Sequence, residues 1–525
     1  MKTMKKLGLY LFFLLPLVSC NDWLNLESEE SVTYQTYFKS EQDIVAVVNG
    51  MFTYERVMMA NNLNVVELAG LYCDNLYDDG FKNLDPDLFF GKGVTSSAGC
   101  QWGNYYSIIY FCNLLEENRY RFEGISDERI DFWLAQANFM KALAFFRVAQ
   151  LWGDAPIPEN SSDLTARGKR PVQEVLDEAV KAAEKALVLP PREQLKDTYN
   201  KSITSKQYAS RGSVYTLLSN IYAWKGGLFN RQEDWKKAEQ YATLVIGDGP
   251  ERETAGHYQL EGNVKDLVTR TLGKERNSDE IIFSITYSSL DFDFVNSPLS
   301  YKFLYPGFLL IGYPYVTSDP WELEYDGDYN ARISVKTVED LYSDEQDTRR
   351  QEYWYQLGKD KDGTELTYAH INKWRDPIWN KQDMDNQFIT AFDCDKVIWR
   401  LADLKLLRAE CRARLGKAEA VNDLNDIRRR AGLDNYSGSM DFELLRREIF
   451  KERERELFGE GQHYYDAIRN GINPRNNFYL GRISPAYIQL SDADIQNGAI
   501  YLPVSEEASK KNPYVKQNTY WLWRK

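Results

Sequence analysis

The feature that most constrains the fold of this chain is a pair of amphipathic helices with the length of a known helical repeat. Apolar residues recur at steps of three and four, first over Trp399–Ala413 and then over Val421–Ala431. This spacing places them on one face of each of two consecutive helices. Gly416 separates the helices, and Gly432 is suited to a left-handed C-cap. The unit 399–432 is 34 residues long, which is the tetratricopeptide (TPR) period.

Helical pairs of the same kind occur earlier in the chain. One pair covers 132–149 and 172–186, and another covers 214–224 and 235–245. Gly226-Gly227 is expected to turn the chain between the two members of the second pair. An earlier helix is expected to begin at Ser40, with Asp43 completing a capping-box-like start. The pattern predicts a mostly α protein built from about four TPR-like helical pairs.

The middle of the chain, 248–395, has little helical periodicity. It is rich in Tyr, Trp, Asp, Asn and Gly, and one short strand is expected over Glu280–Tyr287. So many aromatic residues argue against disorder. Long irregular stretches inside a folded chain are commonly functional. We therefore expect a loop-rich insertion with a few short strands, packed against the helical pairs.

The N-terminus has the layout of an export signal. Three lysines, Lys2, Lys5 and Lys6, precede an apolar run over Leu7–Val18. A basic stretch followed by a short apolar one is typical of a signal peptide. The run is shorter than the roughly 20 apolar residues that cross a bilayer. Residues 1–19 are therefore expected to be removed on export.

The apolar run ends in Leu17-Val18-Ser19-Cys20, which resembles a lipobox. In a lipobox the chain is cut before the cysteine, and the thiol of Cys20 would then receive a diacylglycerol carrying acyl chains such as palmitate. Each buried CH₂ contributes roughly 0.8 kcal/mol, so several chains together hold a protein firmly in a membrane. The alternative is an ordinary signal peptide that happens to contain a cysteine.

Composition excludes several classes of function. The net charge is −14 and no basic patch interleaved with aromatics stands out, so nucleic acid is not expected as a partner. The three histidines, His257, His370 and His463, have no metal-ligand spacing. No GxSxG, P-loop or GxGxxG in its strand–helix context occurs. A Cys73–Cys100 disulfide is allowed in an oxidising compartment, but spacing does not establish it.

Two acidic clusters offer weaker chemical alternatives. Glu452, Glu454 and Glu456 suggest the paired acids of a glycoside hydrolase, although Glu448–Lys451 and Glu452–Arg455 are opposite-charge neighbours typical of a solvated or salt-bridged helix. Oxygen ligands on Asp326, Asp328 and Asn330 could hold a structural Ca²⁺, but a polar turn explains them as well. Neither cluster outweighs the structural interpretation, so we expect no catalytic residue, no metal site and no cofactor.

Several further segments resemble motifs that occur together in one protein family. They are the helix positions Trp102, Tyr106, Ile109 and Asn113, and the segments 142–158, 404–433, 448–471 and 501–518. With the lipobox, they make nearly the whole chain resemble the SusD/RagB family of outer-membrane lipoproteins. The C-terminal segment departs from the family's usual pattern at Val504-Ser505-Glu506-Glu507, which leaves the assignment intact.

The resemblance implies both an architecture and a role. It implies a helical body with four TPR units against an irregular region, and a SusC-like TonB-dependent transporter as partner. The lipoprotein would sit over that barrel at the outer membrane, facing the cell exterior, as a hinged lid that captures oligosaccharides for import. Capture of oligopeptides, as in some family members, is the alternative; a glycoside hydrolase is the third hypothesis.

Pattern and resemblance together divide the chain into five parts. They are a signal peptide at 1–19, a lipidated N-terminus and tether at 20–39, an N-terminal helical region at 40–247, the loop-rich ligand-binding insertion at 248–395, and a C-terminal region with the last TPR unit at 396–525.

Ligand-binding residues are expected on loops outside the helical stripes. Sugars have apolar C–H faces ringed by hydroxyls, so a receptor needs flat aromatic platforms and a few fixed polar groups. The first candidate region comprises Asp74, Asn75, Tyr77 and Asp78, together with Trp102 and Tyr105. The second comprises Tyr313, Tyr315, Trp321 and Tyr325. Trp102 also matches a family helix position, so a role in the core is an equal alternative for it.

Overall fold

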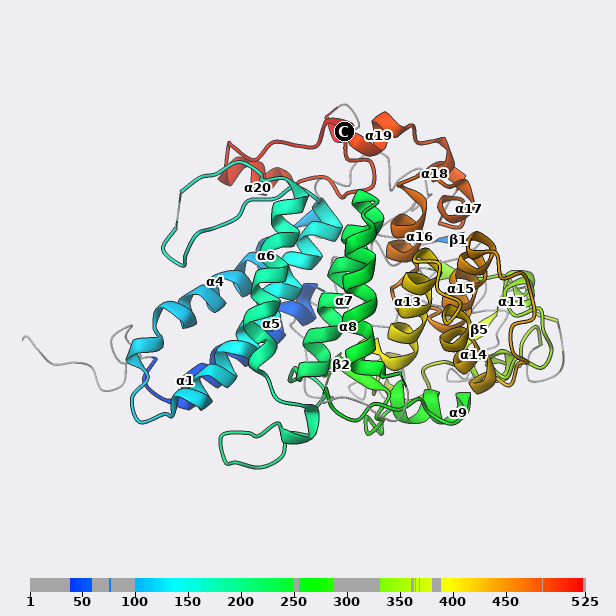
Figure 1. Ribbon diagram of the computed structural model, residues 1–525, viewed down its shortest axis with the longest axis horizontal. Coiled ribbons are helices and arrows are strands. Elements are labelled where there is room, and N and C mark those ends of the chain that lie inside the picture. Colours follow the sequence, from blue (N-terminus) through cyan, green and yellow to red (C-terminus); the bar gives the residue numbers. More distant parts are fainter. Residues whose placement is uncertain are drawn as a thin grey trace, which may run out of the picture.

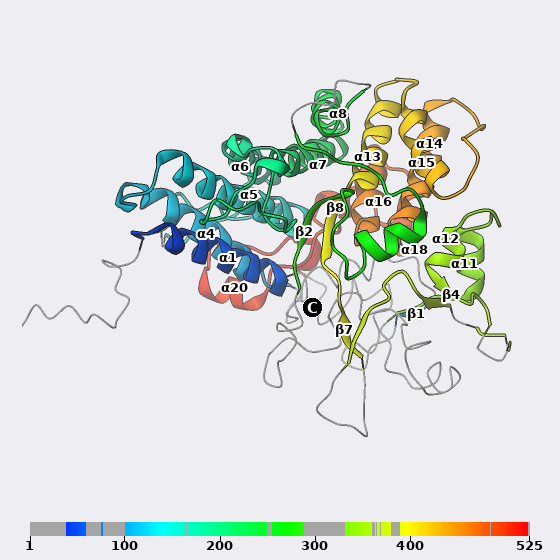
Figure 2. The same ribbon diagram turned by 90° about the horizontal axis from the view of Figure 1, so that it is seen from below.

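The computed structural model describes residues 38–58, 75–76, 100–163, 165–248, 255–287, 331–359, 363, 365–367, 369–379, 389–483 and 485–522. Antiparallel helices follow one another in a curved row along the molecule (Figure 1), and the short strands lie on one side of that row (Figure 2). The predicted mostly α class is confirmed.

The N-terminal half of the row consists of long helices. They are α1 (Glu41–Met58), α4 (Gly103–Glu117), α5 (Asp127–Trp152), α6 (Val172–Lys185), α7 (Arg211–Phe229) and α8 (Gln232–Ile246). The expected start of the first helix is confirmed: the backbone N–H of Ser40 donates to the Asp43 carboxylate at 2.9 Å, and that of Asp43 donates to the Ser40 hydroxyl at 3.3 Å. Such reciprocal bonds satisfy donors that have no partner inside the helix.

The expectation that Gly226-Gly227 turns the chain is wrong. Both glycines lie inside α7, which ends at Phe229 with Asn230 in the left-handed conformation. A Cβ at Gly226 would lie 2.7 Å from the Trp235 ring of α8. A Cβ at Gly227 would meet the backbone oxygen of Arg469 in α16 (His463–Gly471). The pair is there because two neighbouring helices approach α7 closely, which the sequence pattern of one helix does not reveal.

The middle of the chain contributes short elements. The helices are α9 (Val264–Asp266), a π-helical turn (Leu267–Thr271), α11 (Val335–Leu341) and α12 (Arg349–Glu352). The strands form antiparallel pairs: β1 (Asn75–Leu76) with β3 (Ala331–Arg332), β2 (Ile281–Ile285) with β8 (Lys396–Arg400), β4 (Trp354–Tyr355) with β5 (His370–Ile371), and β6 (Pro377–Trp379) with β7 (Ile389–Phe392).

The strand expected within Glu280–Tyr287 is confirmed as β2, and its partner β8 corrects the start of the last TPR unit. Trp399 was expected on the first helix of that unit, but it lies on β8, where its ring is 6.1 Å from that of Phe283. The helix α13 (Leu401–Arg414) begins two residues later. Both strands are buried throughout, so their apolar residues fill the space between the helical row and the middle region.

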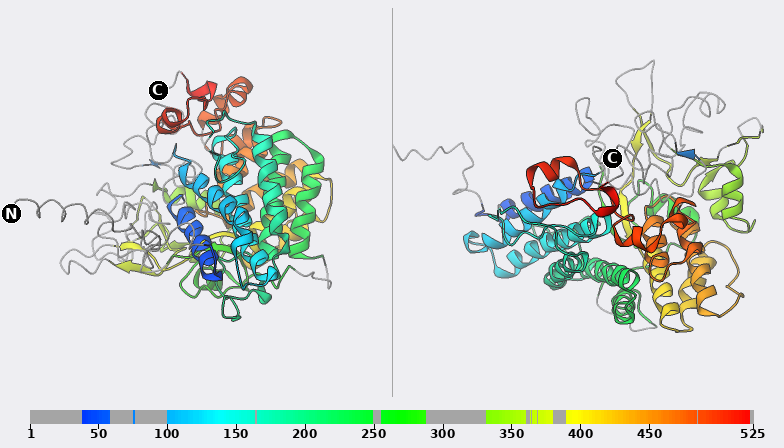
Figure 3. Two further views of the ribbon diagram at one scale, coloured as in Figure 1. Left: turned by 90° about the vertical axis from the view of Figure 1, so that its left-hand side faces the viewer. Right: turned by 90° about the horizontal axis from the view of Figure 1, so that it is seen from above.

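The C-terminal part holds the remaining helices. They are α13, α14 (Ala420–Arg430), α15 (Phe442–Glu456), α16, α17 (Asn477–Leu480), α18 (Pro485–Gln489), α19 (Asp492–Gln496) and α20 (Glu506–Lys511). Gly416 and Gly432 have φ of 71° and 81°, which confirms their predicted helix-ending roles. The segment after α16 runs along one edge of the row (Figure 3). It brings the end of α20 to the loop that follows α5, where the Asn512 side chain donates to the Arg167 oxygen at 2.9 Å. No helix among the described residues is long and apolar enough to cross a bilayer.

Candidate functional site

An aromatic cluster lies where α4 begins. The Trp102 ring is 5.8 Å from that of Trp152 at the end of α5 and 5.7 Å from that of Tyr106. The Tyr105 ring is 6.1 Å from that of Trp152. These edge-to-face arrangements add to the stabilisation from area burial. Tyr105 is fully buried and Trp102 is 8% exposed, so both of these members of the first candidate region pack in the core.

The turn after α5 is fixed against this cluster. The Tyr106 hydroxyl donates to the backbone oxygen of Pro156 at 2.7 Å, and burial raises the pKa of Tyr106 far above its ordinary value, so it stays a donor. Gly153 has φ of 70°, and a Cβ there would lie 2.7 Å from the Tyr501 ring. The Asp154 carboxylate accepts from the Val172 N–H at 2.8 Å and so caps α6. These contacts give a physical reason for the sequence Gly153-Asp154-Ala155-Pro156 within the family-like segment 142–158.

Backbone pairing joins part of the first predicted ligand-binding region to chain that follows the second. In the β1–β3 ladder Asn75 lies opposite Arg332, and Leu76 lies opposite Ala331. Asn75 belongs to the first candidate region, and Ala331 follows the second region by a few residues. The chain therefore brings the first region next to the end of the segment that carries the second.

Most of the predicted site residues lie outside the described residues. This holds for Cys20, Asp74, Tyr77, Asp78, Tyr313, Tyr315, Trp321 and Tyr325, for the calcium candidates Asp326, Asp328 and Asn330, and for Cys73 of the possible disulfide with the buried Cys100. Of Asn75 only the backbone is described. Among the described residues no group of His, Cys, Asp or Glu is arranged to hold a metal ion.

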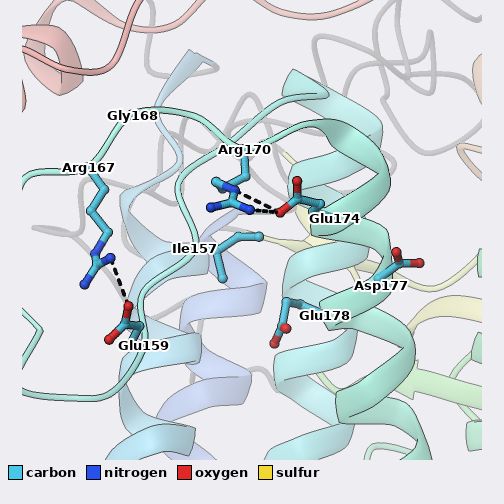
Figure 4. Close-up of a pocket in the computed structure, with 8 residues that line it drawn as sticks. All are labelled: Ile157, Glu159, Arg167, Gly168, Arg170, Glu174, Asp177 and Glu178. Atoms are coloured by element: carbon cyan, nitrogen blue, oxygen red, sulfur yellow. Dashed lines mark hydrogen bonds and ion pairs between the residues drawn. The ribbon is translucent and has the colours of Figure 1, made fainter.

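A cavity that the sequence did not predict lies on the other side of the Gly153–Pro158 turn (Figure 4). Its volume is about 340 Å³. The lining residues come from the loop after α5 and from the outer face of α6: Ile157, Glu159, Arg167, Gly168, Arg170, Glu174, Asp177 and Glu178. The sequence holds no strong signal for it, because its walls are ordinary surface charges that only the loop geometry brings together.

The three glutamates considered for hydrolysis are buried in ion pairs. Glu452 contacts Arg349 at 2.7 Å, Glu456 contacts Arg400 at 2.6 Å, and Glu454 contacts Arg482 at 2.5 Å. Burial works to raise the pKa of Glu452, but Arg349 and Arg455 lower it to about 2. A general acid needs a raised pKa, so this carboxylate is not suited to that role. The expected Glu448–Lys451 and Glu452–Arg455 pairs are confirmed, both at 2.7 Å, although Glu452 is buried rather than solvated.

Two family models that both describe SusD-like proteins match the chain, one in its N-terminal part and one in its C-terminal part. A model described as "SusD family" matches residues 317–521, and one described as "Starch-binding associating with outer membrane" matches residues 22–223. A SusD-like protein of Formosa agariphila is 23% identical to this chain, and the alignment covers 88% of this chain and 89% of that protein. The starch-binding protein SusD of Bacteroides thetaiotaomicron is 24% identical, over 74% of this chain and 73% of that protein.

Solved structures agree with this fold. A SusD homolog from Bacteroides thetaiotaomicron has a TM-score of 0.72 at 21% identity, and the match covers 92% of this chain and 98% of that one. NanU of B. fragilis has a TM-score of 0.69 at 18% identity, over 94% and 99%. The class that fold and sequence define is that of outer-membrane-associated, SusD-like binding proteins. The chain belongs to the SusD/RagB family.

Proposed function

We propose that this protein is a cell-surface lipoprotein that binds an oligosaccharide and delivers it, as a lid, to a SusC-like TonB-dependent transporter. The observation that carries the proposal is the β1–β3 pairing, in which Asn75 lies opposite Arg332. It pairs chain of the first predicted ligand-binding region with chain that follows the second by a few residues, which supports one shared site. One site can then combine the aromatic platforms of the second region with the amide and carboxylate groups of the first, which is the mixture that a sugar requires.

The relatives support a carbohydrate ligand. Starch binding stands in the name of the Bacteroides thetaiotaomicron relative and in the description of the model that matches 22–223. The hydrolase hypothesis loses its candidate acids, because all three glutamates are engaged by arginines. A role in binding without catalysis is therefore the proposal for this chain.

The proposed lipid anchor would attach to the body where the described chain begins, near Phe38. The Phe38 ring lies 6.5 Å from that of Phe122, and the backbone N–H of Glu123 donates to the Lys39 oxygen at 3.3 Å. Glu41 accepts from Arg129 at 2.8 Å and from Trp133 at 2.6 Å. A tether over 20–39 would then pull on a rigid corner of the helical row, which suits a lid that stays attached while it swings open.

Glycan-array screening followed by calorimetry tests the ligand class. We expect the wild-type protein to bind one family of oligosaccharides, and Trp321→Ala to weaken that binding at least tenfold. Tyr120→Ala is the matched control, because Tyr120 is 83% exposed and lies past the opposite end of α4 from Trp102. Binding of peptides in a parallel pull-down, with no glycan bound, would replace the proposal by oligopeptide capture.

The anchor and the partner are tested in cells. Cys20→Ser should abolish incorporation of labelled palmitate and release the protein from the outer-membrane fraction. Affinity purification of the wild-type protein from detergent-solubilised membranes should recover a TonB-dependent transporter. Unchanged palmitate labelling in the Cys20→Ser variant would contradict lipidation at that residue.

A further inference from the structure

The cavity beside α6 is framed by a loop that is closed at its base. Ala155 and Arg170 form an isolated antiparallel bridge, with the Ala155 N–H donating to Arg170 at 3.1 Å and the Arg170 N–H donating to Ala155 at 2.9 Å. The Asp154 cap on Val172 fixes α6 at the same point. The loop between these residues therefore leaves and rejoins the body at one place.

The loop is also held along its length. Asp163, whose side chain is 5% exposed, accepts from the backbone N–H groups of Glu159 at 3.1 Å and Thr165 at 3.2 Å, and from Arg167 Nε at 3.1 Å. These donors, the Glu159 N–H first, hold the pKa of Asp163 at about 2, so it stays ionised. Glu117 at the end of α4 accepts from the Ser161 N–H at 2.8 Å. A loop fixed in this way loses little conformational entropy when a ligand binds.

The charges that line the cavity are already paired, two of them with lysines outside the lining. Arg167 contacts Glu159 at 2.9 Å, and Arg170 contacts Glu174 (Figure 4). Asp177 is held by Lys225 at 2.6 Å, and Glu178 by Lys181 at 3.4 Å. A ligand with its own charge would have to break one of these pairs. A ligand with hydroxyl groups can donate to the carboxylates and accept from the guanidinium groups while the pairs stay intact.

Size and surface agree with a small polyol. About 340 Å³ lies at the small end of the range for ligand pockets, roughly 300–1,000 Å³. Ile157 gives one wall of the cavity an apolar side chain, against which the C–H face of a sugar ring can pack. The Arg170 and Glu174 side chains are 59% and 42% exposed, so their polar groups are open to a ligand.

We propose that this cavity is a second carbohydrate subsite that holds one uncharged sugar residue between Arg167, Arg170 and Glu174. It deepens the proposed function and rests on it. Ile157 follows Pro156, whose oxygen accepts from Tyr106 in the aromatic cluster, so the subsite and the cluster around Trp102 share one turn. A chain of several sugar residues would gain avidity from two sites on one body without tighter contacts at either.

Saturation-transfer NMR on the full chain tests the subsite. The probes are maltotriose, xylotriose and mannotriose, with trigalacturonate as the charged counterpart. The Trp321→Ala background separates the subsite from the principal site. In that background we expect at least one neutral trisaccharide to bind with millimolar affinity and trigalacturonate to give no signal. Adding Arg170→Gln and Glu174→Gln should weaken the neutral ligand at least tenfold.

The matched control is Glu233→Gln in α8, which removes an exposed carboxylate paired with Lys236 at 2.7 Å away from the cavity lining. It should change the affinity by less than twofold, and thermal unfolding should show that all variants are folded. Loss of all binding in the Trp321→Ala background would overturn the subsite and leave the proposed function standing. Equal binding with and without the Arg170→Gln and Glu174→Gln substitutions would also overturn it. Absence of glycan binding by the wild-type protein would overturn both.

Discussion

Arg400 Nη1 lies 2.6 Å from Glu456 Oε1, and both side chains are at most 1% exposed. This pair joins β8 to α15, with Arg349 and Arg430 also in contact with Glu456. Glu280 and Glu460 complete the partners of Arg400. Burial works to raise the pKa of Glu456, and the surrounding arginines lower it below its ordinary value. The middle region is therefore attached to the C-terminal helices α14 and α15 by charges as well as by apolar packing.

Removing one charge from this network should be strongly destabilising. Glu456→Gln removes the carboxylate that Arg349, Arg400 and Arg430 share, so these buried arginines lose one counter-charge and we expect the free energy of unfolding to fall by about 3–5 kcal/mol. Denaturant titration followed by circular dichroism measures it. Glu506→Gln is the control, because its pair with Lys510 at 3.2 Å is exposed and should contribute less than about 1 kcal/mol. Equal effects of the two substitutions would contradict a structural role for the network.

A second buried carboxylate predicts a pH dependence. Glu55 in α1 is fully buried, and within the described part of the chain neither of its carboxylate oxygens has a hydrogen-bond partner. Burial raises its pKa from 4.5 to about 7, and Arg147 offsets this only in part. Between pH 4.5 and 7 the folded state therefore holds a proton that the unfolded state has released. This contribution to stability is fully present below pH 4.5 and is lost as the pH rises through 7.

The size of the effect follows from the shift in pKa. At 1.36 kcal/mol per pKa unit, Glu55 should make the wild-type protein lose about 3 kcal/mol between pH 4.5 and 8. Glu55→Gln removes the titrating group, so the difference in stability between variant and wild type should grow in the variant's favour over this range. Chemical denaturation at several pH values measures it. Parallel stability curves for the two proteins would show that Glu55 does not titrate in this window.

Two helical glycines should respond to alanine in opposite directions. At Gly227 a Cβ would meet the Arg469 backbone, which cannot move aside as a flexible side chain would, so Gly227→Ala is expected to cost about 1–3 kcal/mol. At Gly50 in α1 no atom of the described residues lies within 4 Å of the Cβ position. Gly50→Ala should therefore stabilise by roughly 0.5–1 kcal/mol through helix propensity. Thermal unfolding compares the two, and destabilisation by both would mean that α1 does not accept a Cβ at Gly50.

The helical pairs could be predicted because their signal is local. Spacing over 399–432, the Ser40 cap and the glycines after α13 and α14 each depend on neighbours within one turn of helix. Gly226-Gly227 and Trp399 were misplaced because their positions depend on distant partners, namely Trp235, Arg469 and Phe283. The apolar stripe of one helix does not show whether a glycine ends that helix or lies inside it and lets a neighbouring helix pack closely.

The candidate site was harder to predict for the same reason. The cavity beside α6 has walls of paired surface charges, and only the Ala155–Arg170 bridge brings Arg167 close to that helix. The charged helix α15 was expected to be salt-bridged, which holds, but sequence periodicity could not reveal that Glu452 and Glu456 face a buried arginine from the middle region. Residue type alone therefore does not separate a buried ion pair from a solvated one.

Because Trp102 is buried, a variant at this position can distinguish a structural role of the side chain from direct contact with the ligand. Trp102 is 8% exposed and packs on Trp152, so Trp102→Ala should lower the free energy of unfolding by about 3–5 kcal/mol. If Trp102 supports the site from below, the folded fraction of this variant should bind glycan with an affinity reduced less than in Trp321→Ala. Calorimetry at low temperature, where both variants are folded, measures this ratio, and Trp102→Phe should restore most of the stability. Unchanged stability together with a tenfold loss of affinity would instead make Trp102 an open platform for the sugar.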